Sequence, residues 1–259
     1  MKQFLLMFTS FVIISCSSNG NVTVEQEIKN YDVFKVRNKS IGEYHNYLMG
    51  LNIEEKENLL RKKIPEEQII SLLKENLKIN LIKDFGISEN EYENFINKIN
   101  FQTLENQKGV ENKELNLNTQ LEEALEFVAK QNPSLSSDLR IISNVTSYDY
   151  TTYLTKVDEI KSKYKNSGNE VFVFMVIDVS KSSHNFWVNK SKGLYSKGGN
   201  YDSVWQADVS GAIIGGTWGG VAGSFGGGIG ALPGALLGGG ISSAYGSAAA
   251  GIWNYINNR

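Results

Sequence analysis

The feature that most restricts how this chain can fold is a glycine-rich segment near its C-terminal end. Sixteen of the 25 glycines lie between residues 211 and 251, and no charged residue occurs between residues 209 and 258. Glycines four residues apart form one ridge along a helix, where another backbone can approach closely. We therefore predict a glycine zipper. Its helix-packing positions are Gly211, Gly215, Gly219, Gly223, Gly227, Gly230, Gly234 and Gly238.

Pro233 and Gly234 divide this segment into two halves. As helices, residues 211–232 and 234–253 would each be about 30 Å long, which matches the hydrocarbon core of a bilayer. Trp205 stands before the first half, and Trp253 lies at the end of the second, where the aromatic belts of membrane proteins occur. The sequence therefore predicts a helical hairpin within residues 201–259.

Glycine also makes such a hairpin unstable on its own in water. Each glycine costs a helix about 1 kcal/mol relative to alanine, whereas in lipid an unpaired backbone group costs several kcal/mol. Three states are therefore open to residues 201–259. The segment inserts in a membrane, which we favour, packs on the chain's own helices, or remains a flexible tail.

The first sixteen residues have the pattern of an export signal. Lys2 supplies a positive charge, and residues 4–14 form an apolar run that is too short to span a bilayer as a helix. Residues 13–16 read Ile-Ile-Ser-Cys, which resembles the lipobox of bacterial lipoproteins. The resemblance implies removal of residues 1–15 and acylation of Cys16 by diacylglyceryl and acyl groups such as palmitate. Residues 16–40 would then form a lipidated N-terminus and tether.

Composition excludes several classes of function. Lys and Arg number 26 against 28 Asp and Glu, which argues against a nucleic-acid binder because such proteins need a basic face. The single cysteine rules out an intramolecular disulfide and a multi-cysteine metal site. We expect no cofactor and no bound metal.

Residues 41–200 are predicted to form a helical body. Pro65 followed by two glutamates is typical of a helix start, and Gly86 of a helix end. We expect a loop at residues 105–118 and a helix from Thr119 to Gln131 that Asn132 and Pro133 terminate. Residues 148–166 show helical spacing again. The Val- and Phe-rich run 171–179 fits either a strand or a buried helix; we favour the helix, because the sequence offers no partner strand.

Two short stretches carry the chain's only histidines. Residues 42–46, GEYHN, contain His45, and residues 178–187, DVSKSSHNFW, contain His184. A hydrolase would use Ser182 or Ser183 with His184 and Asp178. However, no nucleophile-elbow motif surrounds these serines, and catalytic triads are assembled from distant segments. A metal site built on the two histidines is a further alternative. We favour polar residues that border helices, and we predict no catalytic residues.

Both stretches resemble segments of secreted proteins of unknown function from Bacteroidetes-type bacteria, which share a G-x-x-H-N helix start and a serine-rich segment ending in an aromatic pair. The glycine spacing resembles the zippers of class II bacteriocins. These resemblances imply membrane packing and bring no known activity.

The sequence as a whole predicts an all-α protein, with a helical body followed by a glycine-rich helical hairpin. We expect a lipid-anchored protein of the bacterial cell envelope that is not an enzyme. Its zipper would insert in or pack at a membrane, with membrane perturbation as a special case. Its partners would be membrane lipid and, through the zipper, other copies of itself. The alternative is a lipid-tethered structural or binding module whose tail packs on its own helical domain.

Overall fold

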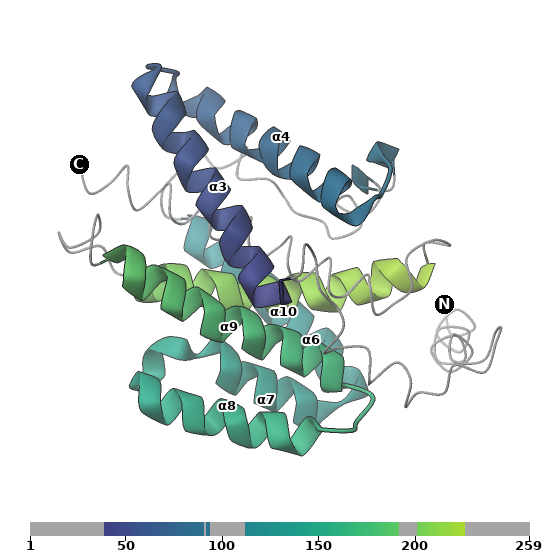
Figure 1. The fold of residues 1–259 in the computed structure, drawn as a ribbon. Helices are drawn as coiled ribbons and strands as arrows, with labels where there is room; N and C mark the ends of the chain where they lie inside the picture. The colour runs from purple at the N-terminus through teal and green to yellow at the C-terminus, as the bar shows by residue number, and fades with distance from the viewer. Residues whose placement is uncertain (1–38, 91, 94–111, 192–200, 226–259) are drawn as a thin grey trace.

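The computed structural model describes residues 39–90, 92–93, 112–191 and 201–225 (Figure 1). Within these ranges the chain forms seven α-helices, one short 3-10 turn and no strand, so the all-α prediction is confirmed there. Cys16 and all residues beyond Phe225, including Pro233 and the predicted second half of the hairpin, lie outside the described residues.

The first two described helices form a hairpin that projects from one side of the molecule (Figure 1). Helix α3 (Ile41–Arg61) begins with a capping box, in which Ser40 and Glu43 bond to each other's backbone N–H. Helix α4 (Glu66–Phe85) follows Pro65 and ends at Gly86, whose φ of 64° is the left-handed conformation that favours glycine. Both predicted ends of α4 are therefore confirmed.

The predicted loop at residues 105–118 is wrong for its last part, because helix α6 (Asn112–Gln131) begins at Asn112 rather than at Thr119. Leu117 explains the difference. It lies one helical turn before Leu121 and packs against the same core, so the apolar stripe extends into a stretch whose polar composition resembles a loop.

Asn132 and Pro133 do end α6, but they also begin the next helix. In α7 (Pro133–Ser143), proline occupies the first turn, and the Asn132 side chain accepts a hydrogen bond from the Leu135 N–H at 3.0 Å. A 3-10 turn (Val145–Ser147) follows, and then helix α8 (Tyr150–Tyr164), which Asp149 caps. The prediction of helix over residues 148–166 is confirmed for residues 150–164.

Residues 171–179 are helical, as favoured above. They belong to α9 (Glu170–Ser191), which lies between α3 on one side and α8 on the other (Figure 1). Val173, Val176 and Val179 are all fully buried. Burial on several faces makes this helix apolar almost all round, which is why its sequence also resembles a strand.

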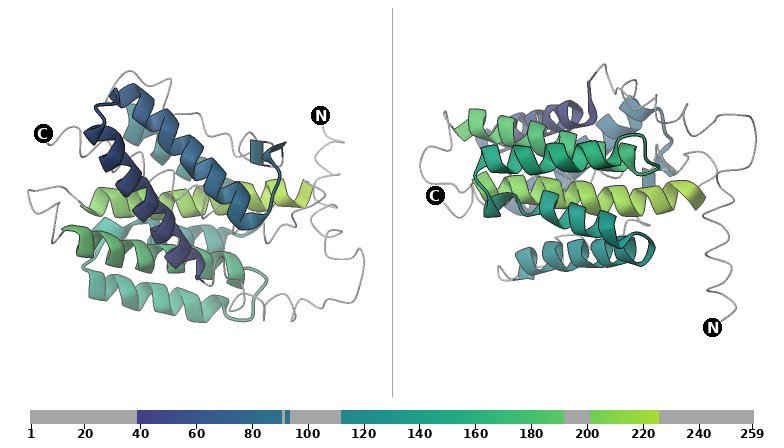
Figure 2. Two further views of the ribbon diagram at one scale, coloured as in Figure 1. Left: turned by 45° about the horizontal axis from the view of Figure 1, so that its top comes forward. Right: turned by 90° about the horizontal axis from the view of Figure 1, so that it is seen from below.

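Helix α10 (Tyr201–Phe225) contains the first part of the predicted zipper and lies at the centre of the molecule (Figures 1 and 2). It packs against α9, α6 and α7. Ala212, Ile213 and Ile214 are at most 2% exposed. Among the described helices, none combines the length and the apolar character needed to cross a bilayer.

The glycines of α10 bring neighbouring side chains close to its backbone. A Cβ atom at Gly216 would lie 2.6 Å from the Phe172 ring and 2.7 Å from the end of Met175. Gly211, Gly215 and Gly219 are also buried. Gly216 therefore allows the side chains of Phe172 and Met175 on α9 to pack close to the α10 backbone. The helix-packing role of Gly211, Gly215 and Gly219 stays a prediction.

Candidate functional site

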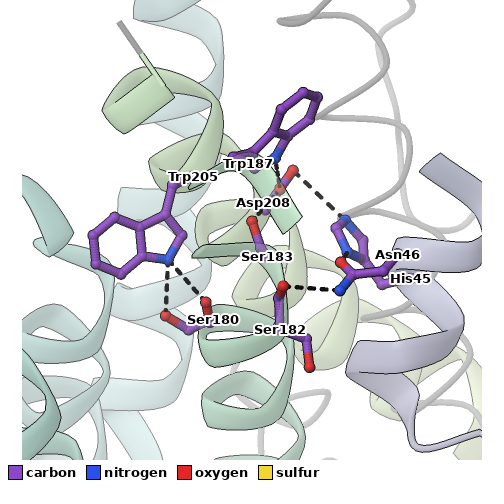
Figure 3. A network of polar contacts seen from close by, with 8 residues as sticks. All are labelled: His45, Asn46, Ser180, Ser182, Ser183, Trp187, Trp205 and Asp208. Atoms are coloured by element: carbon purple, nitrogen blue, oxygen red, sulfur yellow. Dashed lines mark hydrogen bonds and ion pairs between the residues drawn. The ribbon is translucent and has the colours of Figure 1, made fainter. Parts of the chain in front are cut away.

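Four buried polar residues from three helices meet at the centre of the fold, and we call them the polar cluster: His45 on α3, Ser183 and Trp187 on α9, and Asp208 on α10 (Figure 3). One oxygen of Asp208, Oδ2, accepts hydrogen bonds from Ser183 Oγ at 2.5 Å and from Trp187 Nε1 at 2.9 Å. The other oxygen, Oδ1, lies 3.6 Å from His45 Nε2. His45 and Asp208 are both completely buried.

The helix that carries His45 also makes direct main-chain contact with α9. The Gly42 N–H donates to Asp178 Oδ2 at 2.7 Å. Asn46 Nδ2 donates to the Ser182 carbonyl oxygen at 2.8 Å, as Figure 3 shows. A Cβ atom at Gly42 would overlap the main-chain oxygen of Asp178 and lie 2.5 Å from Ser182 Oγ. The two stretches that carry the histidines therefore bind each other, and only glycine fits at position 42.

Burial raises the pKa of the Asp178 carboxyl, and the hydrogen bond from Gly42 opposes that shift only in part. The carboxyl faces the N-terminal end of α3, where the helix dipole favours a negative charge. Asp178 therefore serves as a second cap for α3, supplied by another helix.

A second set of buried polar groups lies next to the polar cluster on α9. Tyr153 donates its hydroxyl proton to the Ile142 carbonyl at 3.0 Å, so Ser180 Oγ, 2.6 Å away, must donate to the tyrosine oxygen. Trp205 Nε1 in turn donates to the Ser180 carbonyl at 3.0 Å. Trp205 is 3% exposed and lies in the protein core.

In the hydrolase alternative, Ser182 or Ser183 would act with His184 and Asp178, and the observed contacts of Ser183 differ from that arrangement. Ser183 donates to Asp208 instead of His184, and Asp178 accepts from Gly42. The His184 ring stacks on Tyr150 with centroids 3.5 Å apart and planes 8° apart. A nucleophilic serine requires a base within hydrogen-bond reach, and Ser183 here faces a carboxylate buried without contact to solvent.

No group of three or more His, Cys, Asp or Glu side chains with metal-binding geometry exists in the described part of the chain. His45 faces Asp208, and the ring contacts of His184 are with Tyr150 and Trp205.

The sequence patterns point to most members of these contacts but not to Asp208. The stretches 42–46 and 178–187 contain the other members, whereas Asp208 stands immediately before the uncharged segment. A signal for it exists: Asp208 is an isolated carboxylate between Val204 and Phe225, in an otherwise uncharged run. A charge in that position needs a buried partner.

Comparison with known proteins adds no relative: no protein-family model, no curated protein and no solved structure matches this chain.

The polar cluster and its neighbours thus join α3, α9 and α10 through directional contacts. Buried polar groups with specific partners fix one arrangement of helices, because any other arrangement leaves donors or acceptors unpaired. Of the predicted zipper positions, Gly211, Gly215 and Gly219 lie in the buried part of α10 and Gly223 lies near its end. Gly227, Gly230, Gly234 and Gly238 lie outside the described residues.

Proposed function

We propose that the protein is a lipid-anchored module of the bacterial cell envelope, with a structural or binding role, whose glycine-rich helix α10 packs within its own helical body. The observation that carries this proposal is the position of α10. It is the central helix of the fold, and α9, α6 and α7 pack against it.

The polar residues of α10 support packing inside the protein. Asp208 has donors on α9 that match it in position and type. The small residues of α10 then serve close packing between helices of one chain, which is the alternative role for the zipper set out above.

The anchor rests on residues 1–16. The lipobox resemblance places a lipid on Cys16, and stable attachment to a membrane needs more than one acyl chain. An anchored body of this kind presents its helices to the space beside the membrane and needs no spanning helix of its own.

The anchor is tested by labelling a lipoprotein-processing bacterial host with radioactive palmitate. We expect the full-length chain to incorporate the label, Cys16→Ser to lose it, and the matched control Ser17→Ala to keep it. A labelled Cys16→Ser chain, or an unlabelled parent chain, contradicts lipidation at Cys16.

The position of α10 is tested separately by amide hydrogen exchange on the full-length Cys16→Ser chain, with and without vesicles of anionic phospholipid. We expect the amides of residues 208–219 to be protected equally in both samples, because the body itself excludes water from them. Protection that appears only when vesicles are added supports membrane insertion instead and overturns this part of the proposal.

A further inference from the structure

We propose that the outer face of helix α4 is a contact surface for a second copy of this chain, and that two copies pair there with their α4 helices antiparallel. The inference concerns the assembly of the protein and is independent of the lipid anchor. It rests on the exposed side chains of α4, on their order along the helix and on their charge.

The outer face of α4 carries two large apolar side chains in contact with solvent. Leu72 is 44% exposed and Ile79 is 56% exposed, and no other large apolar side chain is as exposed in the part of the chain that the structure describes. The two residues are seven positions apart, so they lie on the same face of the helix. Single apolar residues on a surface need no explanation, but two on one face form a ridge that a partner helix can cover.

The order of residues along this face is nearly symmetric. The exposed positions are Gln68, Leu72, Glu75, Ile79 and Lys83, and the half-buried Asn76 lies beside them. The midpoint between Leu72 and Ile79 falls between Glu75 and Asn76. A two-fold axis through this midpoint brings Leu72 of each copy opposite Ile79 of the other. A two-fold interface requires such a self-complementary surface.

The polar residues next to the ridge also match under this symmetry. Glu75 of one copy faces Asn76 of the other. The Asn76 oxygen Oδ1 accepts a hydrogen bond from Asn80 Nδ2 at 3.1 Å, so the Asn76 amide nitrogen can donate to a carboxylate across the axis. Hydrogen bonds to an ionised group are the stronger kind. At the ends of the face Lys83 meets Gln68, so the symmetry places no two like charges directly opposite each other.

The charge of the chain favours a second copy over other partners. Lys and Arg number 26 against 28 Asp and Glu, a net charge of -2, so two copies repel each other only weakly. The outer face itself has one carboxylate, on Glu75, and one ammonium group, on Lys83. The nearby Lys78 is already bound to Glu89 and Glu93. An anionic lipid surface would require a cluster of basic residues instead.

The α3–α4 hairpin presents this face where a second molecule can reach it. The hairpin projects from one side of the molecule (Figures 1 and 2), and α4 packs on α3 with the opposite face, which carries the buried Ile69 and Leu73. Stable interfaces bury at least about 1,200 Å² in total, more than a single crossing of two helices provides. We therefore expect a weak and reversible dimer.

Sedimentation equilibrium of the full-length Cys16→Ser chain, at concentrations from about 10 μM to about 1 mM, tests the pairing. We expect the average mass to rise from that of a monomer toward that of a dimer. Leu72→Lys should remove most of this rise, because it places an ammonium group in the apolar ridge. The matched control Ser71→Lys changes an exposed residue on another face of the helix and should keep the rise. Circular dichroism checks that both variants are folded.

Disulfide cross-linking tests the antiparallel register. Leu72→Cys and Ile79→Cys are made as two separate chains in the Cys16→Ser background. Opposed residues come within reach of a disulfide, whereas residues seven apart along a helix are separated by about 10 Å. A mixture of the two chains should therefore cross-link about fivefold faster than either chain alone. Lys62→Cys, exposed at the tip of the hairpin, is the control and should cross-link slowly.

Three outcomes overturn the proposal. Either cysteine chain cross-links with itself as fast as the mixture does, which contradicts an antiparallel pair. The dimer keeps its affinity in Leu72→Lys, which assigns self-association to another part of the chain. The parent chain stays monomeric up to about 1 mM; if Leu72→Lys then also weakens binding to vesicles of anionic phospholipid, the outer face of α4 contacts lipid instead.

Discussion

The two ends of helix α3 make very different contacts. The first end, residues 41–49, packs on α9 through a main-chain approach at Gly42, two hydrogen bonds and the polar cluster. The second end packs on α4 and forms a small apolar cluster with it. The buried members of this tip cluster are Leu59, Ile69 and Leu73, with Leu60 and Ile64 packed against them.

The difference shows what fixes the position of a helix. Apolar contact at the tip is non-directional and tolerates sliding or rotation, whereas the contacts at residues 41–49 require particular atoms opposite one another. We therefore expect changes at the first end to affect the whole fold, and changes at the tip to remain local.

The largest effect is expected for Asp208→Ala. It leaves the Ser183 hydroxyl and the Trp187 N–H without their buried acceptor, and we expect a loss of about 3–5 kcal/mol in the free energy of unfolding. Denaturant titration followed by circular dichroism measures it. The control is Ser210→Ala, two residues further along the same helix. It removes a buried hydroxyl that has no hydrogen-bond partner, so the loss in the free energy of unfolding should be far smaller. Equal losses in the two variants would show that the polar cluster does not stabilise the fold.

Gly42→Ala comes next, because the new methyl group would overlap the backbone of α9. Overpacking of this kind costs about 1–3 kcal/mol, and a backbone neighbour cannot turn away. Gly50→Ala is the matched control in the same helix, since a Cβ atom there meets nothing within 4 Å. It should stabilise the chain by about 0.5–1 kcal/mol. Thermal melts of the two variants should move in opposite directions, and a parallel shift would disprove the close approach.

Leu73→Ala tests the tip. Losing a buried leucine costs about 2–5 kcal/mol in a large core, and we expect the low end here because the cluster is small. The effect should be local: amide exchange in residues 59–73 should increase, while residues 173–184 of α9 should remain protected. Exchange that increases throughout the chain would mean that the hairpin and body unfold as one unit.

A smaller, pH-dependent effect is expected for Asp178→Asn, which keeps an acceptor for the Gly42 N–H. Because burial raises the pKa of Asp178 in the folded chain, the ionised carboxyl destabilises the fold above that pKa, and the penalty disappears as the pH falls below the unfolded value of about 3.9. The variant should therefore gain melting temperature relative to the parent at pH 7 and lose that advantage at pH 3. A difference that is constant with pH would assign the effect to shape rather than charge.

The smallest effect is expected for Lys78→Ala. Lys78 on α4 binds Glu89 at 2.6 Å and Glu93 at 2.7 Å, and these hydrogen bonds raise its pKa. The acceptors are exposed, so water and salt weaken the pairing. We expect a melting temperature within error of the parent in 150 mM salt. A clear drop in the melting temperature would show that the outer face of the hairpin contributes more to stability than its exposure indicates.

Local patterns in the sequence were sufficient for much of the fold. Pro65 and Gly86 mark the ends of α4 because their backbone preferences act within one turn. The start of α6 at Asn112 is not predictable from local patterns, because polar residues surround Leu117 and its contact with the core appears only in the folded chain. Pro133 follows the end of α6 and also begins α7, since proline suits the first turn of a helix.

The candidate site was less predictable for a different reason. His45 lies more than a hundred residues before Asp208, and Ser183 lies 25 residues before it. No local sequence rule predicts that these residues meet. Asp208 also lies beside a glycine pattern that draws attention to membranes. The role of Asp208 depends on hydrogen-bond donors on α9. The periodicity of α10 alone cannot reveal those donors.

The contact at Gly42 makes two remote stretches a single evolutionary unit. A larger residue at position 42 requires the backbone at position 178 to move, and a change at Asn46 deprives the carbonyl of Ser182 of its donor. In distant homologues the two stretches should therefore be kept together or lost together. A search pattern that joins them across the intervening chain would be more selective than either stretch alone.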